Sequence, residues 1–399
     1  MSSKAVIWWI VGVAIVLRVV VGLVHPFEFP DSKDYDGLAR AIVEGREYEV
    51  GGLYATRMPG YPVFVAGVYW VFGYSLRAVL VVQAILSGGV VWLTYLLARR
   101  VSGMQAPPCR LNVALVAAGL VAVDPLSIAF SASLLTETVF TLVLVGGVYV
   151  CVRLVERPGT WGWVWLAVVW VVAVYLRASA FWCIVPLWIV LIFAAYSRRG
   201  KLISAQRLAV VMATLFISLL PWQLRNYAIF SPDRVDFTTL EGISLYEAVY
   251  PEATGGPRQD LIELPVEMKS LNEAQRNAEW SRRAWQFIRD DPGRIAGLAV
   301  RKVARMWSPV LNAAEFRNVW VQIALAVWYV PMFLMALVGI WPMSSRKALL
   351  LVPIFYFTGI HAIFLGSVRY RVPLMPLLSV FAAIGIVWLV QCVRKPNRE

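Results

Sequence analysis

Acidic and basic side chains follow the first long apolar stretch of this 399-residue chain. Among them are Asp31 and Asp34, and Arg57 lies two residues before a rigid turn that begins at Pro59. An arginine holds a phosphate through charge-assisted, paired hydrogen bonds. A carboxylate and a fixed cation beside a lipid headgroup therefore suit transfer chemistry on a phosphate-bearing lipid.

Residues 30–45 predict a short interfacial helix, because Tyr35, Leu38 and Ile42 share one face. This helix offers a structural explanation for the acidic pair. Asp31 could be its N-cap, with Asp34 as the capping-box partner, favoured by the helix dipole. The sequence leaves the capping role and the chemical role of Asp31 both open.

Two further carboxylates, Asp124 and Glu137, flank a short turn between apolar stretches. An ionisable group so close to hydrocarbon is costly, which makes it a functional candidate. Glu137 is the stronger of the two. Its structural alternative is exposure at the membrane interface, or an ion pair with Arg177.

Several cations lie at predicted helix ends further along the chain. Arg225 follows Pro221-Trp222, and Arg369 and Arg371 precede the last apolar stretch. Arginine is suited to bidentate phosphate binding, although it also extends to bulk headgroups. His361 could donate a hydrogen bond to a phosphate, or could be a core histidine whose hydrogen bonds are satisfied.

The composition identifies the elements that must position these residues. Hydrophobic residues make up 60% of the chain and charged residues only 15%, which predicts an all-α, multi-spanning membrane protein. The net charge of +13 is therefore no sign of nucleic-acid binding. Two histidines are too few for a His-rich metal site, and four widely spaced cysteines argue against a structural metal site or a disulfide framework.

Apolar stretches predict about ten transmembrane helices and one shorter, half-buried or re-entrant element at Gly60–Gly73. The ten spans are 5–24, 76–98, 111–129, 132–152, 160–176, 178–196, 206–222, 319–341, 348–366 and 372–393. Basic residues in alternate short loops place both termini in the cytoplasm. All but two of the 24 carboxylates, Glu156 and Glu399, then lie on or near the external side.

We expect three regions. They are an N-terminal transmembrane module with the first external loop (residues 1–222, with 25–59 as the loop), an external loop or cap (223–318), and C-terminal transmembrane helices (319–399). Within the cap, 272–290 predicts a polar helix and 294–307 a basic amphipathic helix, for membrane-surface packing or for steering an anionic substrate. Residues 241–258 predict an irregular cover over the site.

Taken together, these motifs resemble the GT-C superfamily of polyprenyl-phosphate-sugar-dependent glycosyltransferases, in particular enzymes similar to protein O-mannosyltransferases and the lipid A aminoarabinose transferase. The resemblance covers nearly the whole chain. Its parts are Asp31-Ser32-x-x-Tyr35, Gly45, Arg57-Met58-Pro59-Gly60-Tyr61-Pro62, Gln83, Asp124-Pro125, Thr136-Glu137, Arg177, Pro221-Trp222-x-x-Arg225-Asn226, His361 and Arg369-Tyr370-Arg371-x-Pro373-x-x-Pro376. Many relatives have Asp-Glu where this chain has Asp31-Ser32.

The resemblance implies an inverting glycosyltransferase of the cell membrane with its active site on the external side. Asp31 would be the general base, with Glu137 as a second catalytic candidate. The lipid phosphate would be held by Arg57, Arg225, Arg369, Arg371 and His361, and the donor or acceptor sugar by Asp34, Tyr35, Tyr61 and Arg177. The expected partners are a polyprenyl-phosphate sugar, membrane lipid and a glycan, lipid or protein acceptor, without nucleic acid. We expect no cofactor, and the chemistry does not demand a divalent metal, although one is not excluded.

Other functions are also open. A transporter or flippase of a lipid-linked substrate would show internal repeats and interrupted helices with polar residues near mid-membrane, and the sequence has no repeat. A non-catalytic assembly protein would tolerate the loss of Asp31. A lipid-phosphate transferase that moves another group would use the same arginines.

Overall fold

The computed structural model of the protein describes residues 2–102, 112–199, 205–258, 262–312, 318–341 and 343–393. Over these ranges the chain is helical, and its β structure is limited to isolated bridges at Phe27–Ser133 and Val50–Leu53. The helices are α1 (Ser3–Val24), α2 (Pro30–Val43), α3 (Gly60–Phe72), α4 (Leu76–Val101), α5 (Val113–Ala122), α6 (Pro125–Ser131), α7 (Glu137–Glu156), α8 (Thr160–Leu176), η1 (Ala178–Cys183), α9 (Ile184–Arg199), α10 (Ala205–Phe230), α11 (Glu241–Val249), η3 (Val266–Met268), α12 (Glu273–Asp290), α13 (Pro292–Met306), α14 (Val319–Ile340), α15 (Ser345–Ile363), η5 (Val368–Leu374) and α16 (Met375–Val393). The predicted all-α polytopic class is confirmed.

Six helical segments in the described chain are long and apolar enough to cross a membrane: α1, α4, α7, α14, α15 and the joined η5–α16. A seventh is added if α5 and α6, which bend by 50° at Asp124, count as one. Each predicted span overlaps a helix or two consecutive helices, with residue 111 of the third span outside the described residues, but the count of ten is not confirmed. The 17-residue α8, for example, extends only about 26 Å at the helical rise, less than the roughly 30 Å of the hydrocarbon core.

The helices α14 and α16 cross with their backbones in contact. A Cβ added at Gly339 would lie 1.8 Å from the carbonyl oxygen of Phe381, and one at Gly385 would lie 2.0 Å from that of Met335. Small residues at such a crossing let two membrane helices approach closely. The crossing fixes α16, which continues directly from η5 and so from Arg369.

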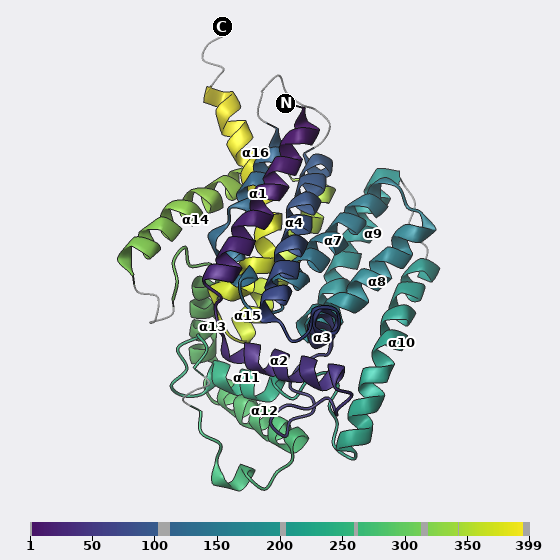
Figure 1. Cartoon of the computed structure of the whole chain (residues 1–399), viewed down its shortest axis with the longest axis vertical. Helices are drawn as coiled ribbons and strands as arrows, with labels where there is room; N and C mark the ends of the chain where they lie inside the picture. The colour runs from purple at the N-terminus through teal and green to yellow at the C-terminus, as the bar shows by residue number, and fades with distance from the viewer. Residues whose placement is uncertain are drawn as a thin grey trace.

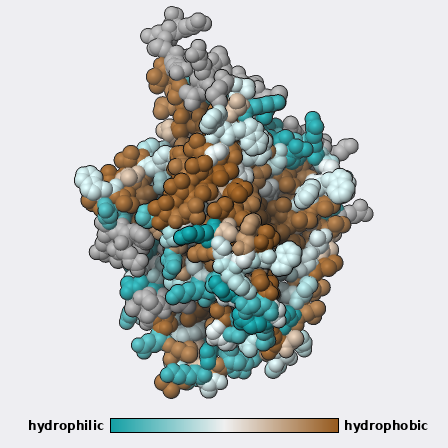
Figure 2. All heavy atoms as spheres, in the orientation of Figure 1, coloured by the Kyte–Doolittle hydropathy of each residue, from teal (hydrophilic) through white to brown (hydrophobic). Residues whose placement is uncertain are grey.

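Polar elements gather at one end of the molecule. Figure 1 shows α2, α11 and α12 together below the main helix bundle, with α13 beside them. Figure 2 shows hydrophilic side chains concentrated at this lower end and hydrophobic ones over the bundle above it. The amphipathic division is that of a membrane protein with one large region outside the bilayer.

The local predictions in this polar region have mixed outcomes. The helices expected at 30–45 and 272–290 are observed as α2 and α12, and the amphipathic helix is α13. The stretch expected to be irregular contains the helix α11 instead. Asp31 is not the N-cap of α2, because Phe29 occupies that position and the helix begins at Pro30, which suits a first helical position.

Loops predicted to share the cytoplasmic side do meet at one end of the bundle. Glu156, at the end of α7, forms ion pairs with Arg100 of α4 and, at 3.4 Å, with Arg346 of α15. The first residues of α1 and the last of α16 lie at this same upper end in Figure 1. The structure therefore agrees with the predicted grouping of these loops.

Candidate functional site

Asp31 lies in the first turn of α2 and bridges two arginines from distant parts of the chain. Its Oδ1 is 2.7 Å from Nη2 of Arg57, and its Oδ2 is 2.7 Å from Nη1 of Arg369. Because η5 contributes Arg369 and the loop before α3 contributes Arg57, this one carboxylate joins the segment between α1 and α3 to the beginning of the last span.

Glu137, the first residue of α7, extends this chain of charges into the protein. Its side chain is fully buried, and its Oε1 pairs with Nη2 of Arg177 at 2.7 Å and with Nε of Arg369. Arg177 also donates to Oγ1 of Thr136 at 2.8 Å. The structural alternative considered for Glu137, a pair with Arg177, is thus observed, and Arg369 is added to it.

Asp34 joins this group of charges on its more exposed side. Its Oδ2 accepts hydrogen bonds from Arg57 through Nη2 at 2.9 Å and Nε at 3.2 Å. We call Asp31, Asp34, Arg57, Glu137, Arg177 and Arg369 the charged cluster. Three carboxylates balance three guanidinium groups, so the cluster is formally neutral.

The electrostatics keep Asp31 ionised. Burial raises the pKa of its carboxyl, but Arg57 and Arg369 together lower it further, to about 2. For Arg57, burial lowers the pKa, yet Tyr35, Asp31 and Asp34 more than offset this and raise it above its usual value. At neutral pH both groups are therefore charged.

Arg57 packs on Tyr35, which in turn packs on Tyr61. The guanidinium of Arg57 is 5.3 Å from the centre of the buried Tyr35 ring. Tyr61 packs edge-on against Tyr35, with ring centroids 4.8 Å apart, and donates a 2.8 Å hydrogen bond to Gln83. Tyr61 therefore supports Tyr35 from within the bundle, and the sugar contacts expected of the two tyrosines remain predictions.

His361 and Arg371 lie near the cluster in sequence but have other contacts. The imidazole of His361 stacks on Tyr370 at 4.0 Å, and its Nδ1 is 3.0 Å from the carbonyl oxygen of Leu365. Arg371 is fully buried, donates to the carbonyl oxygen of Met306 at 3.0 Å, and lies over Tyr329 at 4.5 Å. The structure does not pair either residue with a member of the cluster, and their phosphate contacts remain predictions.

Arg225 holds backbone instead of a carboxylate. Its Nη1 donates to the carbonyl oxygen of Tyr54 at 2.9 Å and its Nη2 to that of Tyr48 at 2.8 Å. Its guanidinium also lies 4.8 Å from the Trp222 ring. Arg225 thus fixes the loop that leads to Arg57, and its contact with the lipid phosphate remains a prediction.

Asp124 has a structural role at the α5–α6 bend. Its Oδ2 caps α6 by accepting from the amide of Ser127 at 2.8 Å, and its Oδ1 accepts from the hydroxyl of Tyr329 at 2.8 Å.

The sequence did not reveal Glu273, the first residue of α12. Its carboxylate accepts hydrogen bonds from the amides of Tyr54 at 2.6 Å and Ala55 at 3.1 Å. After Asn272 it resembles an ordinary acidic residue in a first helical turn, and nothing in its local pattern signals a partner about 220 positions away.

Among the residues that the structure describes, no group of three or more His, Cys, Asp or Glu side chains could hold a metal ion. The carboxylates of the charged cluster are instead matched by arginines.

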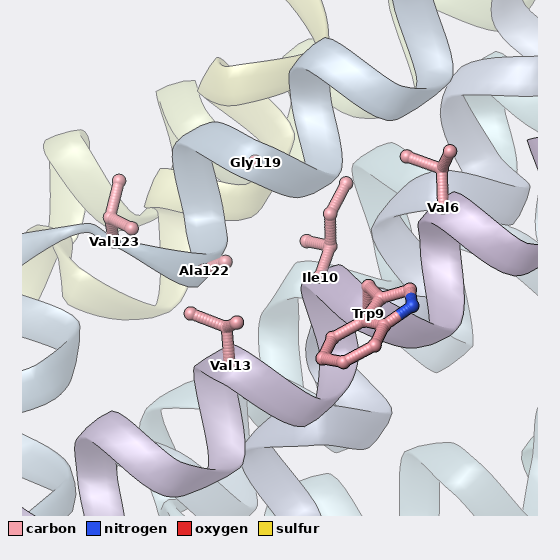
Figure 3. Close-up of a pocket in the computed structure, with 7 residues that line it drawn as sticks. All are labelled: Val6, Trp9, Ile10, Val13, Gly119, Ala122 and Val123. Atoms are coloured by element: carbon pink, nitrogen blue, oxygen red, sulfur yellow. The ribbon is translucent and has the colours of Figure 1, made fainter. Parts of the chain in front are cut away.

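Two hollows lie outside the charged cluster. One, of about 380 Å³, is a wholly apolar groove where Val6, Trp9, Ile10 and Val13 of α1 face Gly119, Ala122 and Val123 at the end of α5 (Figure 3). The other, of about 260 Å³, lies against α2 on the side that carries Lys33, Asp36 and Arg40. Neither is lined by Asp31 or Glu137.

The fold and the site define a polytopic membrane protein with a charged cluster at the polar end of its bundle. Residues 56–222 match the family model of dolichyl-phosphate-mannose-protein mannosyltransferase. That match includes Arg57, Glu137 and Arg177. A search of curated proteins by sequence found no match.

Solved structures of an archaeal oligosaccharyltransferase share the fold at low identity. The oligosaccharyltransferase of Archaeoglobus fulgidus in its apo form has a TM-score of 0.58 at 13% identity, covering 98% of this chain and 51% of its own. The same organism's AglB, in complex with an inhibitory peptide and a dolichol-phosphate, has a TM-score of 0.53 at 12% identity, covering 99% and 52%. This chain therefore spans about half the length of these proteins. ArnT from Cupriavidus metallidurans bound to undecaprenyl phosphate covers 100% of this chain and 82% of its own at 13% identity, with a TM-score of 0.42.

The predicted resemblance is thus confirmed as a resemblance: part of the chain matches the mannosyltransferase family model, and the chain shares its fold with the archaeal oligosaccharyltransferase.

Proposed function

We propose that this protein is a membrane glycosyltransferase that moves a sugar from a polyprenyl-phosphate-linked donor to an acceptor hydroxyl. The observation that carries the proposal is the position of Asp31 between Arg57 and Arg369. A proton acceptor and two phosphate-binding cations then lie within one hydrogen-bonded group at the polar end of the bundle. The dolichol-phosphate bound to the similar archaeal AglB supports a lipid phosphate as the ligand class.

In the proposed reaction the acceptor oxygen attacks the anomeric carbon and breaks its bond to the phosphate oxygen. Asp31 takes the hydroxyl proton, and polyprenyl phosphate leaves with the bonding electron pair. A single displacement inverts the anomeric carbon. The phosphate gains negative charge as a diester becomes a monoester, so arginines stabilise the transition state more than the bound donor.

The arginines of the charged cluster are paired with carboxylates, and this pairing gives the donor a second effect. A phosphate that binds Arg57 and Arg369 competes with Asp31 for their hydrogen bonds. Asp31 then loses part of the stabilisation that lowers its pKa, and it becomes a stronger base. Glu137 and Arg177, on the buried side, keep Arg369 oriented during this exchange.

We place this site on the external side of the cell membrane, with both termini in the cytoplasm. The grouping of Arg100, Glu156 and Arg346 at the opposite end of the bundle supports that arrangement under the positive-inside rule. The acceptor hydroxyl belongs to a glycan, a lipid or a protein.

The test is transfer by purified protein supplied with a panel of labelled polyprenyl phosphate sugars. Wild type should release or transfer sugar, and Asp31→Asn should lower kcat by at least about 100-fold, the lower range for a lost general base. Asp36→Asn is the matched control: Asp36 lies on the same helix but pairs with Arg40 at 2.9 Å, outside the cluster.

Equal turnover by wild type and a folded Asp31→Asn protein would refute the role of Asp31. Donor binding without any turnover would favour the second candidate, a transporter or flippase of a lipid-linked substrate. One observation favours that candidate: the span α5–α6 is interrupted at a buried carboxylate, Asp124, as discontinuous transporter helices are.

A further inference from the structure

The backbone directly before Arg57 is buried and held from two sides by charged residues. Ala55 is fully buried, and Thr56 is only 6% exposed. Buried backbone groups must find hydrogen-bond partners, and residues 54–55 lie in a loop without helical partners. Their partners come from α10, from the segment before α11, and from α12.

On the amide side, Glu273 fills the space in front of two successive N–H groups. Its Oε2 is 2.6 Å from the amide nitrogen of Tyr54, and its Oε1 is 3.1 Å from that of Ala55. Successive N–H groups form a concave site for an anion, and here the anion is a side chain of the protein. Thr239 completes this side by donating its hydroxyl to Glu273 and its amide to the carbonyl oxygen of Ala55 at 2.9 Å.

On the carbonyl side, Arg225 donates to Tyr54 and Tyr48 at 2.9 and 2.8 Å. Tyr48 in turn donates its hydroxyl to the carbonyl oxygen of Arg57 at 3.1 Å. Tyr54 therefore has its N–H on a carboxylate and its C=O on a guanidinium. Charged partners make the stronger class of hydrogen bond, so this peptide segment is firmly held.

We propose that Glu273 is a positioning residue that fixes Arg57 for the donor phosphate by holding residues 54 and 55. The proposal rests on the function proposed above and extends it, because it makes the 223–318 region part of the donor site. Arg57 follows Ala55 by two residues, so a shift of this segment moves its guanidinium away from Asp31. Glutamate is required because it offers two accepting oxygens, whereas glutamine has one and turns an NH2 group toward the other N–H.

The first measurement is hydrogen exchange on the full-length protein in nanodiscs. In Glu273→Gln, peptides covering residues 48–57 should exchange faster than in wild type. Glu279→Gln is the matched control, because it removes a charge from the same helix while its partners are Arg282 and Arg283. Thr239→Val, which removes one hydroxyl donor, should change exchange in the same direction by a smaller factor.

The second measurement is donor affinity, from a titration with labelled polyprenyl phosphate sugar and from kinetics. Glu273→Gln should weaken donor binding and also lower kcat, with a fall of about tenfold in kcat/KM as the loss of one buried hydrogen bond predicts, because Arg57 contacts the phosphate in both the bound donor and the transition state. In an Arg57→Ala background the same substitution should add no further loss, because the effect acts through Arg57.

Three outcomes overturn the proposal. One is unchanged exchange at residues 48–57. Another is faster exchange with wild-type donor affinity, which would make the contact purely structural. The third is an equal loss of affinity with and without Arg57. If wild type itself binds no polyprenyl phosphate sugar, the proposed function fails and the donor phosphate ceases to be the target, while the exchange data still decide whether Glu273 holds the segment.

Discussion

Asp31 has a low pKa, whereas its proposed role as a general base requires a pKa high enough for it to accept a proton. Arg57 and Arg369 lower the pKa of Asp31 to about 2. At pH 5 Asp31 is therefore almost entirely ionised. The proposed release of the arginines by the donor reconciles the two demands.

This argument predicts a pH dependence. Because kcat/KM reports the free enzyme, it should stay flat from pH 7 to pH 5 as far as Asp31 is concerned. The acid limb of kcat should lie at higher pH than that of kcat/KM, since the bound phosphate takes the arginines from Asp31. Initial rates over donor concentration at each pH give both profiles, and an acid limb of kcat/KM near pH 6 would contradict the expectation.

The low pKa of Asp31 also determines how the stability of the fold depends on pH. The pKa of Asp31 is lower in the folded protein than its ordinary value of 3.8, so its ion pairs stabilise the fold above that value. That contribution is lost only as the pH falls toward 2. Between pH 7 and pH 5 the unfolding temperature should therefore not respond to Asp31, which separates any activity loss in that range from unfolding.

At the scale of elements, the crossing of α14 and α16 is the contact most sensitive to one added methyl group. Gly385→Ala places a Cβ 2.0 Å from the carbonyl oxygen of Met335, so the two helices must separate. We expect the free energy of unfolding to fall by about 1–3 kcal/mol, the usual penalty for overpacking. Thermal unfolding in detergent measures the change.

Gly359→Ala in α15 is the control for this variant. An added Cβ there meets nothing within 4 Å, and alanine is the better helix former, so stability should be unchanged or slightly raised. Equal destabilisation by both substitutions would show that the α14–α16 crossing is not closely packed.

Elements defined by local signals could be predicted from the sequence, and those defined by distant contacts could not. Pro30 marks the beginning of α2, and Asn272 caps α12 through the amide of Gln275, so both helices were found nearly to the residue. The role of Asp31 as N-cap was wrong because Phe29 occupies that position. The α11 helix was missed, since its N-cap Leu240 gives no capping signal.

The candidate site divides in the same way. Arg57 was expected near Asp31 because both lie in one loop, and Arg369 was expected there only through the resemblance, since 338 positions separate it from Asp31. The pair of Glu137 with Arg177 was foreseen as an alternative. The Glu273 contact was not, because no local pattern distinguishes a carboxylate that binds a remote backbone from a solvated one.

For the whole molecule, the decisive prediction concerns the two faces of the membrane. Two variants are compared, each with a single cysteine. In the first, which carries Lys269→Cys and no native cysteine, an impermeant maleimide should label the protein from outside intact cells, because the exposed Lys269 lies in the proposed external region. In the second variant, which keeps only Cys392, this exposed cysteine at the end of α16 should react only after the membrane is permeabilised. The reverse pattern would place the charged cluster on the cytoplasmic side.

The formal neutrality of the charged cluster also bears on which anions the protein accepts. Arg57 and Arg369 are both paired with Asp31, so an incoming anion must displace this carboxylate before it can bind them. Free phosphate is dilute in solution, so it competes poorly with the carboxylates for the two arginines. A phosphate confined to the bilayer surface by its lipid tail arrives at a much higher effective concentration. Discrimination between soluble and lipid-borne anions then follows from where the ligand is held, without any additional contact to its headgroup.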